Sequence, residues 1–288
     1  MNSFSIKRCW QVLCWLLSVN RVVLLGLFSG VFVGIFLIEM GILIMLPDSA
    51  PRECVRYSSG LATSILLLLF VVFVSTAFTR FTHLGSKQQR ATFLMLPAMN
   101  LEKFLAVMFY VTVVCTSLSI LAVALADSLR VGLMALLGQG LWPSSIPWII
   151  GNLTPIVLEP GAESIYPLSF RVMYLAMLSV EILFVHAHYT LGATLLRKYS
   201  FVISSIVLML WAFLAFKITI RPMYDEMHLF HTIWEKGHLV TVEVNGVAYI
   251  FVAMLFIAAT AAYWNAYRIF KHFEINSNKW TNYDILKR

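Results

Sequence analysis

Charged residues are scarce in this sequence. Asp, Glu, Lys and Arg together make up 12% of the 288 residues, whereas hydrophobic residues make up 60%. Soluble domains contain about 25% charged residues, so this composition excludes an ordinary soluble domain. The net charge of +7 does not indicate nucleic-acid binding, because the sequence has no basic face interleaved with aromatic residues. The composition instead predicts a membrane protein.

Cysteines and catalytic motifs are also few. Of the four cysteines, Cys9 and Cys14 precede the first apolar run, Cys115 lies inside a later one, and only Cys54 is expected on the outer side. This distribution excludes a disulfide framework. The sequence has no phosphate-binding Gly-x-x-x-x-Gly-Lys-Ser/Thr loop, no Gly-x-Ser-x-Gly elbow and no His-Glu-x-x-His pair. We therefore expect no enzyme activity, no cofactor and no metal site on this chain.

Long hydrophobic runs dominate the sequence. A helix needs about 20 apolar residues to cross a bilayer. Six runs approach or exceed that length, and together they predict an all-α, polytopic integral membrane protein with a single transmembrane domain over residues 22–270. The predicted spans cover residues 22–46, 61–79, 104–126, 166–191, 201–220 and 247–267.

The two ends of the chain differ from this core. Residues 1–21 predict an amphipathic helix that lies in the membrane interface, because Ile6, Trp10, Leu13 and Leu17 recur at helical spacing on one face. Such a helix either anchors the chain or orients the first span, and the sequence leaves both alternatives open. Residues 271–288 form a predicted cytoplasmic tail.

The positions of lysine and arginine predict the orientation of the chain. Positively charged residues are concentrated in cytoplasmic segments of membrane proteins. If the N-terminus is cytoplasmic, 14 of the 21 Lys and Arg residues lie on the inner side. These are Lys7, Arg8, Arg21, Arg80, Lys87, Arg90, Lys103, Arg197, Lys198, Arg268, Lys271, Lys279, Lys287 and Arg288. We therefore expect a multi-pass protein with both termini in the cytoplasm.

Two outer connections have distinctive compositions. The connection over residues 127–165 is apolar and contains several Trp and Pro residues, which favours short helices against the outer membrane face. Apolar and polar residues alternate from Val240 to Val244, just before Asn245-Gly246. This pattern indicates a small β-hairpin with its turn at the Asn-Gly pair.

Four ionisable residues fall inside predicted spans: Glu39, Glu181, His186 and His188. Ionisable groups within a membrane are costly and often functional. Glu181 and His188 are seven residues apart and share a helix face, whereas His186 and His188 do not. The group is therefore a candidate intramembrane polar site, either a proton or metal relay or an internal hydrogen-bond network.

A polar segment over residues 86–104 separates the second and third spans. Ser86 and Gln89 have the spacing of a capping box, which predicts a short helix that Pro97 ends. We expect Asn100 to cap the next helix and Glu102 to lie in its first turn, where the helix dipole favours a carboxylate.

The same segment predicts a docking surface. Phe93, Leu94 and Met95 are expected to form an exposed apolar edge beside Lys87 and Arg90. An exposed apolar patch usually indicates a contact with a partner, although a solvated connecting turn is the alternative.

Two segments resemble a known family. The first reads Gln89-Arg90-x-Thr92-Phe93-Leu94-Met95-Leu96-Pro97, followed by Asn100-Leu101-Glu102-Lys103. It resembles the segment after the second span of type-2 ABC export permeases, in a branch familiar from Bacteroidetes. The second segment, residues 189–201, is similar to a Leu-Gly-x-x-x-Phe-Arg-Lys element of the same proteins.

The resemblance implies a transmembrane permease subunit that works with a separate cytoplasmic ABC ATPase. ATP and Mg would bind to that partner, and a second copy of the chain or a related permease would complete the pathway. The residues implied in coupling to the ATPase are Lys87, Gln89, Arg90, Thr92, Phe93, Leu94, Met95 and Pro97. Export of an unidentified substrate is the implied activity, and the Trp- and Pro-rich connection over residues 127–165 favours an amphipathic one.

Two other functions remain open from the sequence. One is an ion- or proton-coupled secondary transporter that uses Glu39, Glu181 and His188. The other is a membrane scaffold or sensor subunit that holds an ATPase at the membrane without transporting a substrate.

Overall fold

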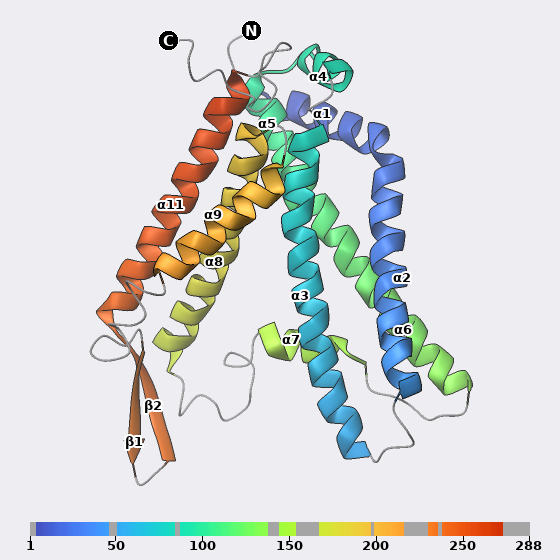
Figure 1. The fold of residues 1–288 in the computed structure, drawn as a ribbon, viewed down its shortest axis with the longest axis vertical. Helices are drawn as coiled ribbons and strands as arrows, with labels where there is room; N and C mark the ends of the chain where they lie inside the picture. The colour runs from blue at the N-terminus through green and yellow to red at the C-terminus, as the bar shows by residue number, and fades with distance from the viewer. Residues whose placement is uncertain are drawn as a thin grey trace. The chain divides into compact units, whose positions relative to one another are not determined.

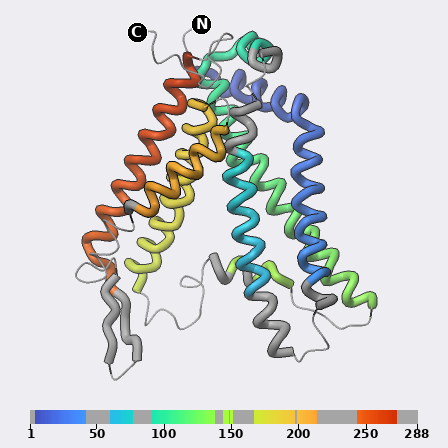
Figure 2. The backbone as a smooth tube through the Cα atoms, in the orientation of Figure 1, coloured from blue at the N-terminus to red at the C-terminus, as the bar shows by residue number. Residues whose placement is uncertain are grey.

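A computed structural model describes residues 4–45, 51–83, 87–137, 144–153, 167–196, 199–215, 230–235 and 238–272, and Figure 1 draws the remaining residues as a thin grey trace. Figure 2 shows the backbone in the same orientation as a tube. The chain divides into two compact units. Unit one contains Met1–Thr76 and Leu105–Pro155, and unit two contains Ala77–Phe104 and Ile156–Arg288.

Unit one is built from helices. They are α1 (Ile6–Val19), α2 (Arg21–Met45), α3 (Pro51–His83) as far as Thr76, α5 (Asn100–Phe109) from Leu105, the π-helix η1 (Tyr110–Cys115), α6 (Thr116–Leu136) and α7 (Ile146–Leu153). The predicted N-terminal helix is present as α1, but its buried residues are Val12, Leu13 and Leu16. Ile6 and Trp10, which we expected on the same apolar face as Leu13, are exposed.

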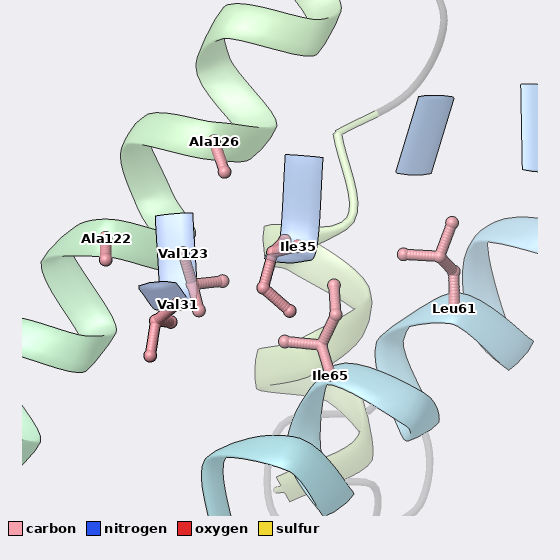
Figure 3. Close-up of a cluster of buried hydrophobic side chains, with 7 residues drawn as sticks. All are labelled: Val31, Ile35, Leu61, Ile65, Ala122, Val123 and Ala126. Carbon is pink, nitrogen blue, oxygen red and sulfur yellow. The ribbon is translucent and has the colours of Figure 1, made fainter. Parts of the chain in front are cut away.

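The core of unit one lies where α2, α3 and α6 meet. Figure 3 shows its seven buried side chains, Val31, Ile35, Leu61, Ile65, Ala122, Val123 and Ala126. The contribution of α6 includes two alanines, and small residues allow apolar helices to approach closely. Ile149 of α7 packs against the same cluster, so α7 is part of this unit's packing.

The third predicted span is longer than expected. Helix runs without interruption over Asn100–Leu136, with η1 in its interior, whereas the sequence predicted a span over residues 104–126. Asp127 and Arg130, which we assigned to the outer connection, therefore lie within α6, and both are buried. Their mutual ion pair explains how a helix continues through two charged residues.

Unit two contains α4 (Lys87–Leu94), α8 (Leu168–Leu195), α9 (Ser200–Ala215) and α11 (Gly246–Lys271). Figure 1 shows α8 beside α9 and α11, and α8 packs against both. Gly192 lets α9 approach α8 closely, because a Cβ atom at this position would lie 1.8 Å from Ser204 Oγ. Tyr199, between the two helices, has a left-handed φ of 56°.

Unit two also contains the only strands in the described part of the chain. β1 (Phe230–Glu235) pairs antiparallel with β2 (His238–Val244), and Phe230 lies opposite Val244. The expected strand is therefore present, but the hairpin reverses between Glu235 and His238, and Asn245-Gly246 leads into α11 instead. The β-branched residues Val240, Thr241, Val242 and Val244 favour a strand here, and helices form the rest of the regular structure in the described residues, as the all-α prediction expected.

Four helical stretches are long and apolar enough to cross a membrane: Arg21–Gly41, Asn100–Leu136, Leu168–Leu195 and Gly246–Lys271. Gly60–Thr76 and Ser200–Phe213 are shorter apolar stretches at two further predicted spans. The chain is thus a multi-pass membrane protein candidate by length and composition. Parts of our predictions, namely Leu46, Tyr166, residues 216–220 and the tail after His272, lie outside the described residues.

Candidate functional site

The segment Lys87–Phe104 forms a corner between α4 and α5, and we call it the α4–α5 corner. The chain turns after Leu94, and the backbone N–H of Ala98 donates to the carbonyl of Leu96 at 2.8 Å. The predicted short helix is therefore confirmed, but it ends three residues before Pro97. Ser86, the first residue of the predicted capping box, lies outside the described residues.

The start of α5 is capped differently from our expectation. The backbone N–H of Met99 donates to Glu102 Oε2 at 2.8 Å, so the buried Glu102 carboxylate satisfies a helix N-terminus as predicted. Asn100, however, does not cap the helix. It is the first residue of α5, and its Nδ2 donates to the carbonyl of Lys271 at 3.3 Å. This bond joins the corner to the end of α11.

Lys103 is a buried residue of α5 that connects α5 to the end of α4. Its Nζ donates to the carbonyl of Leu94 at 2.8 Å and lies 6.0 Å from the centre of the Phe93 ring. A cation at the last carbonyl of a helix complements the helix dipole, so Lys103 stabilises the end of α4. The lysine is buried, so α4 and α5 hold one another at a fixed angle.

Phe93 is an internal anchor and not part of an exposed edge. Only 2% of Phe93 is exposed, and its ring meets the Phe270 ring edge-on, with centroids 6.1 Å apart. Phe104 contacts the rings of Phe270 and Tyr267, each at 5.4 Å. The expectation that Phe93 is part of an exposed edge is therefore wrong, because the aromatic residue Phe270 of α11 packs against its ring.

The exposed part of the corner is smaller than predicted. Met95 is 81% exposed, Thr92 and Pro97 are also exposed, and Leu94 is half-buried. The side chains of Lys87, Gln89 and Arg90 lie outside the described part of the structure, so their predicted roles stay predictions. The apolar surface available for docking centres on Met95.

Unit one contains a second group of polar residues, Glu39, Asp127 and Arg130, which we call the ion cluster. Arg130 Nη2 lies 2.7 Å from Asp127 Oδ1, and Arg130 Nε lies 3.3 Å from Glu39 Oε2. All three side chains are almost completely buried. The guanidinium thus links a carboxylate of α2 to one of α6 in surroundings of low polarity.

Asp127 also binds the segment that leads into α7. The Ser144 hydroxyl donates to Asp127 Oδ2, and the backbone N–H of Ser145 donates to Asp127 Oδ1 at 3.1 Å. The hydroxyl oxygen of Ser144 in turn accepts the N–H of Ile146 at the start of α7. Sequence reasoning missed this arrangement, although the spacing of Asp127 and Arg130 is that of a helical ion pair.

The four residues of the predicted intramembrane site are distributed over both units. Glu39 belongs to unit one, whereas Glu181, His186 and His188 lie on α8 in unit two. His186 Nδ1 lies 2.7 Å from the Tyr263 hydroxyl, and His188 Nε2 lies 3.0 Å from the Ser204 carbonyl. For the histidines, the geometry matches the internal hydrogen-bond network that we kept as an alternative.

Comparison of the chain with protein families, with curated proteins and with solved structures gives no match. Within the described residues, no group of three or more His, Cys, Asp or Glu side chains has an arrangement suited to a metal ion. The two segments quoted above therefore remain the basis of the resemblance to type-2 ABC permeases.

Proposed function

We propose that the chain is the membrane subunit of a type-2 ABC exporter in a bacterial inner membrane. In this proposal six helices cross the bilayer, the four long apolar stretches together with α3 and α9. Both termini and α4 lie in the cytoplasm, in agreement with the distribution of Lys and Arg. A separate ABC ATPase binds ATP and Mg, and a second permease unit completes the pathway for an amphipathic substrate.

The α4–α5 corner is the observation that supports this proposal most. Phe93 fixes α4 to α11, Lys103 fixes it to α5, and Asn100 joins α5 to the end of α11. A displacement of α4 would therefore move two long apolar helices. This is the property that a coupling helix needs in order to convert closure of an ATPase into a change of access across the membrane.

Met95 is the residue we expect to contact the ATPase. Its side chain is 81% exposed, and its flexible thioether adapts to an apolar cleft. The neighbouring Thr92 and Pro97 are also exposed. Phe93 has a different role in this proposal, because it holds α4 in place from the side opposite to the partner.

The test is co-purification of the chain with the ATPase encoded next to it. We expect Met95→Asp to reduce recovery of the ATPase at least about tenfold, since a charge at the centre of a contact typically costs more than about 1.4 kcal/mol. Leu136→Asp is the matched control, because Leu136 is 84% exposed at the other end of the helix Asn100–Leu136 and faces the outer side in this topology. Equal recovery with both variants, or no ATPase with the unchanged chain, would refute the proposal.

The ion cluster gives one specific reason to keep the secondary-transporter alternative. Buried carboxylates in apolar surroundings are typical of proton-coupled pathways, and Glu39 is buried beside Asp127 and Arg130. The purified chain in proteoliposomes distinguishes the two functions. Substrate movement driven by a proton gradient without ATP would favour the alternative. A scaffold subunit would be indicated if substrates do not stimulate ATP hydrolysis by the assembled complex.

A further inference from the structure

An apolar groove of about 380 Å³ lies within unit one between α1 and the first turns of the helix Asn100–Leu136. Leu13 and Ala106, both buried, form its floor. Ile6 and Trp10 on one side and Phe109 on the other are exposed at its rim. The groove therefore combines a closed floor with an open mouth, which suits a long, narrow apolar ligand.

Few side chains that line the groove have polar groups that need a hydrogen-bond partner from a ligand. Thr112 lines it, and its hydroxyl donates to the carbonyl of Met108 at 2.7 Å, inside the helix itself. Apart from the Cys9 thiol and the indole N–H of Trp10, the other lining groups are hydrocarbon, aromatic or thioether. An occupant that offers only CH₂ groups would therefore lose no hydrogen bond, whereas a polar one would be desolvated without compensation.

Two cations of α1 stand next in sequence to Ile6 at the rim of the groove. Lys7 and Arg8 follow Ile6 directly in α1, and α1 contains no acidic residue. Lys7 is exposed, and no described side chain pairs with it. A cationic amphipathic helix of this kind attracts anionic headgroups, at about 1 kcal/mol for each Lys or Arg near the surface.

We propose that this groove binds an acyl chain of an anionic phospholipid whose phosphate lies against Lys7. The tail would fill the space between α1 and α5, and the headgroup would remain in the interface beside the polar face of α1. Such a lipid would join the N-terminal helix to the helix that begins at the α4–α5 corner. The binding does not depend on an ATPase, so this inference is independent of the proposed function.

Lipid retention by the purified chain tests the inference. The chain in mild detergent is incubated with phosphatidylglycerol or with phosphatidylcholine of the same acyl chains, and bound lipid is counted by native mass spectrometry. We expect preferential retention of phosphatidylglycerol. Lys7→Glu should reduce that preference about fivefold or more, the change expected from the loss of a cation near the headgroup. Equal retention of the two lipids by the unchanged chain would overturn the proposal.

A groove-filling variant tests the acyl chain separately. Ala106→Leu places three extra carbon atoms in the floor of the groove, and Ala124→Leu makes the same change on the same helix away from it. We expect only Ala106→Leu to lose bound lipid. Similar lipid retention by the two variants would contradict the site. Displacement of the bound lipid by glycerol phosphate alone, or occupation of the groove by a second copy of the chain, would also contradict it. Because Ala106 is buried, the unfolding temperature of the Ala106→Leu variant is measured first. If this variant does not fold, the lipid preference of Lys7→Glu, a change at an exposed residue, tests the site instead.

Discussion

The helix Asn100–Leu136 contains two buried cations with different surroundings, Lys103 in unit two and Arg130 in unit one. Lys103 donates to a backbone carbonyl and lies over an aromatic ring. Arg130 lies between two buried carboxylates. Burial is nearly the same for the two residues, so the comparison isolates the effect of the partners.

The difference concerns what remains when the cation is removed. At the α4–α5 corner, loss of Lys103 leaves one neutral carbonyl without its donor. In the ion cluster, loss of Arg130 leaves Glu39 and Asp127 buried close together without a neutralising charge. An unpaired buried charge destabilises a protein far more than an unsatisfied neutral group. Lys103 thus stabilises only the local contact between α4 and α5, whereas the ion cluster affects the stability of unit one.

The largest effect is expected for Arg130→Met. Breaking a buried ion pair on one side lowers the free energy of unfolding by about 3–5 kcal/mol. Unfolding in mixed micelles with increasing denaturing detergent measures this change. Arg21→Met is the control, because Arg21 is exposed at the start of α2 and should change the free energy by less than about 0.5 kcal/mol. If the two variants are equally stable, Arg130 does not hold the ion cluster together.

An intermediate effect is expected for Lys103→Met. The substitution keeps the apolar length of the side chain but removes the donor to the Leu94 carbonyl, at a loss of about 2 kcal/mol for a hydrogen bond from a charged group. The loss should be local, so limited proteolysis in Met95–Ala98 should become faster while unit one unfolds as before. A loss as large as that of Arg130→Met would show that the two cations do not differ as we describe.

The smallest effect is expected for Ser144→Ala. This change removes a hydrogen bond to Asp127 and the acceptor for the Ile146 N–H at the start of α7, for which the loss of a helix cap predicts about 1 kcal/mol. Ser128→Ala is the control on α6, because its exposed hydroxyl bonds only to the Ala124 carbonyl. The free energies of unfolding of the two variants are compared under the same conditions. Equal values would show that Ser144 does not stabilise the ion cluster.

The sequence predicted local features of the fold better than distant ones. The long helices follow from hydrophobic runs, and the place of Glu102 in the first turn of α5 was predicted from the local sequence. The aromatic anchor of Phe93 could not be predicted in this way, because its partner Phe270 is distant in sequence. Apolar composition alone made Phe93 and Met95 equivalent, and only tertiary packing distinguishes the buried ring from the exposed thioether.

The ion cluster shows a different reason for failure. A search for apolar runs treats Asp127 and Arg130 as the end of a span, because each charge by itself is unfavourable in a membrane. The two residues form a pair one helical turn apart and share it with Glu39, which removes most of that penalty. A search for pairs of opposite charges next to predicted span ends would have found the Asp127–Arg130 ion pair. It would not have found the hydrogen bond from Ser144.

The π-helix η1 determines which faces of the long helix are available to different neighbours. A π turn contains about one residue more than an α turn, so the residues after it are rotated by about 100° relative to an unbroken α-helix. Before η1, the helix turns Leu105 and Phe109 to the groove beside α1, and after it Ala122 and Ala126 pack against α2. One inserted residue thus changes the phase of the helical repeat, so a single continuous helix presents two stripes that face different directions.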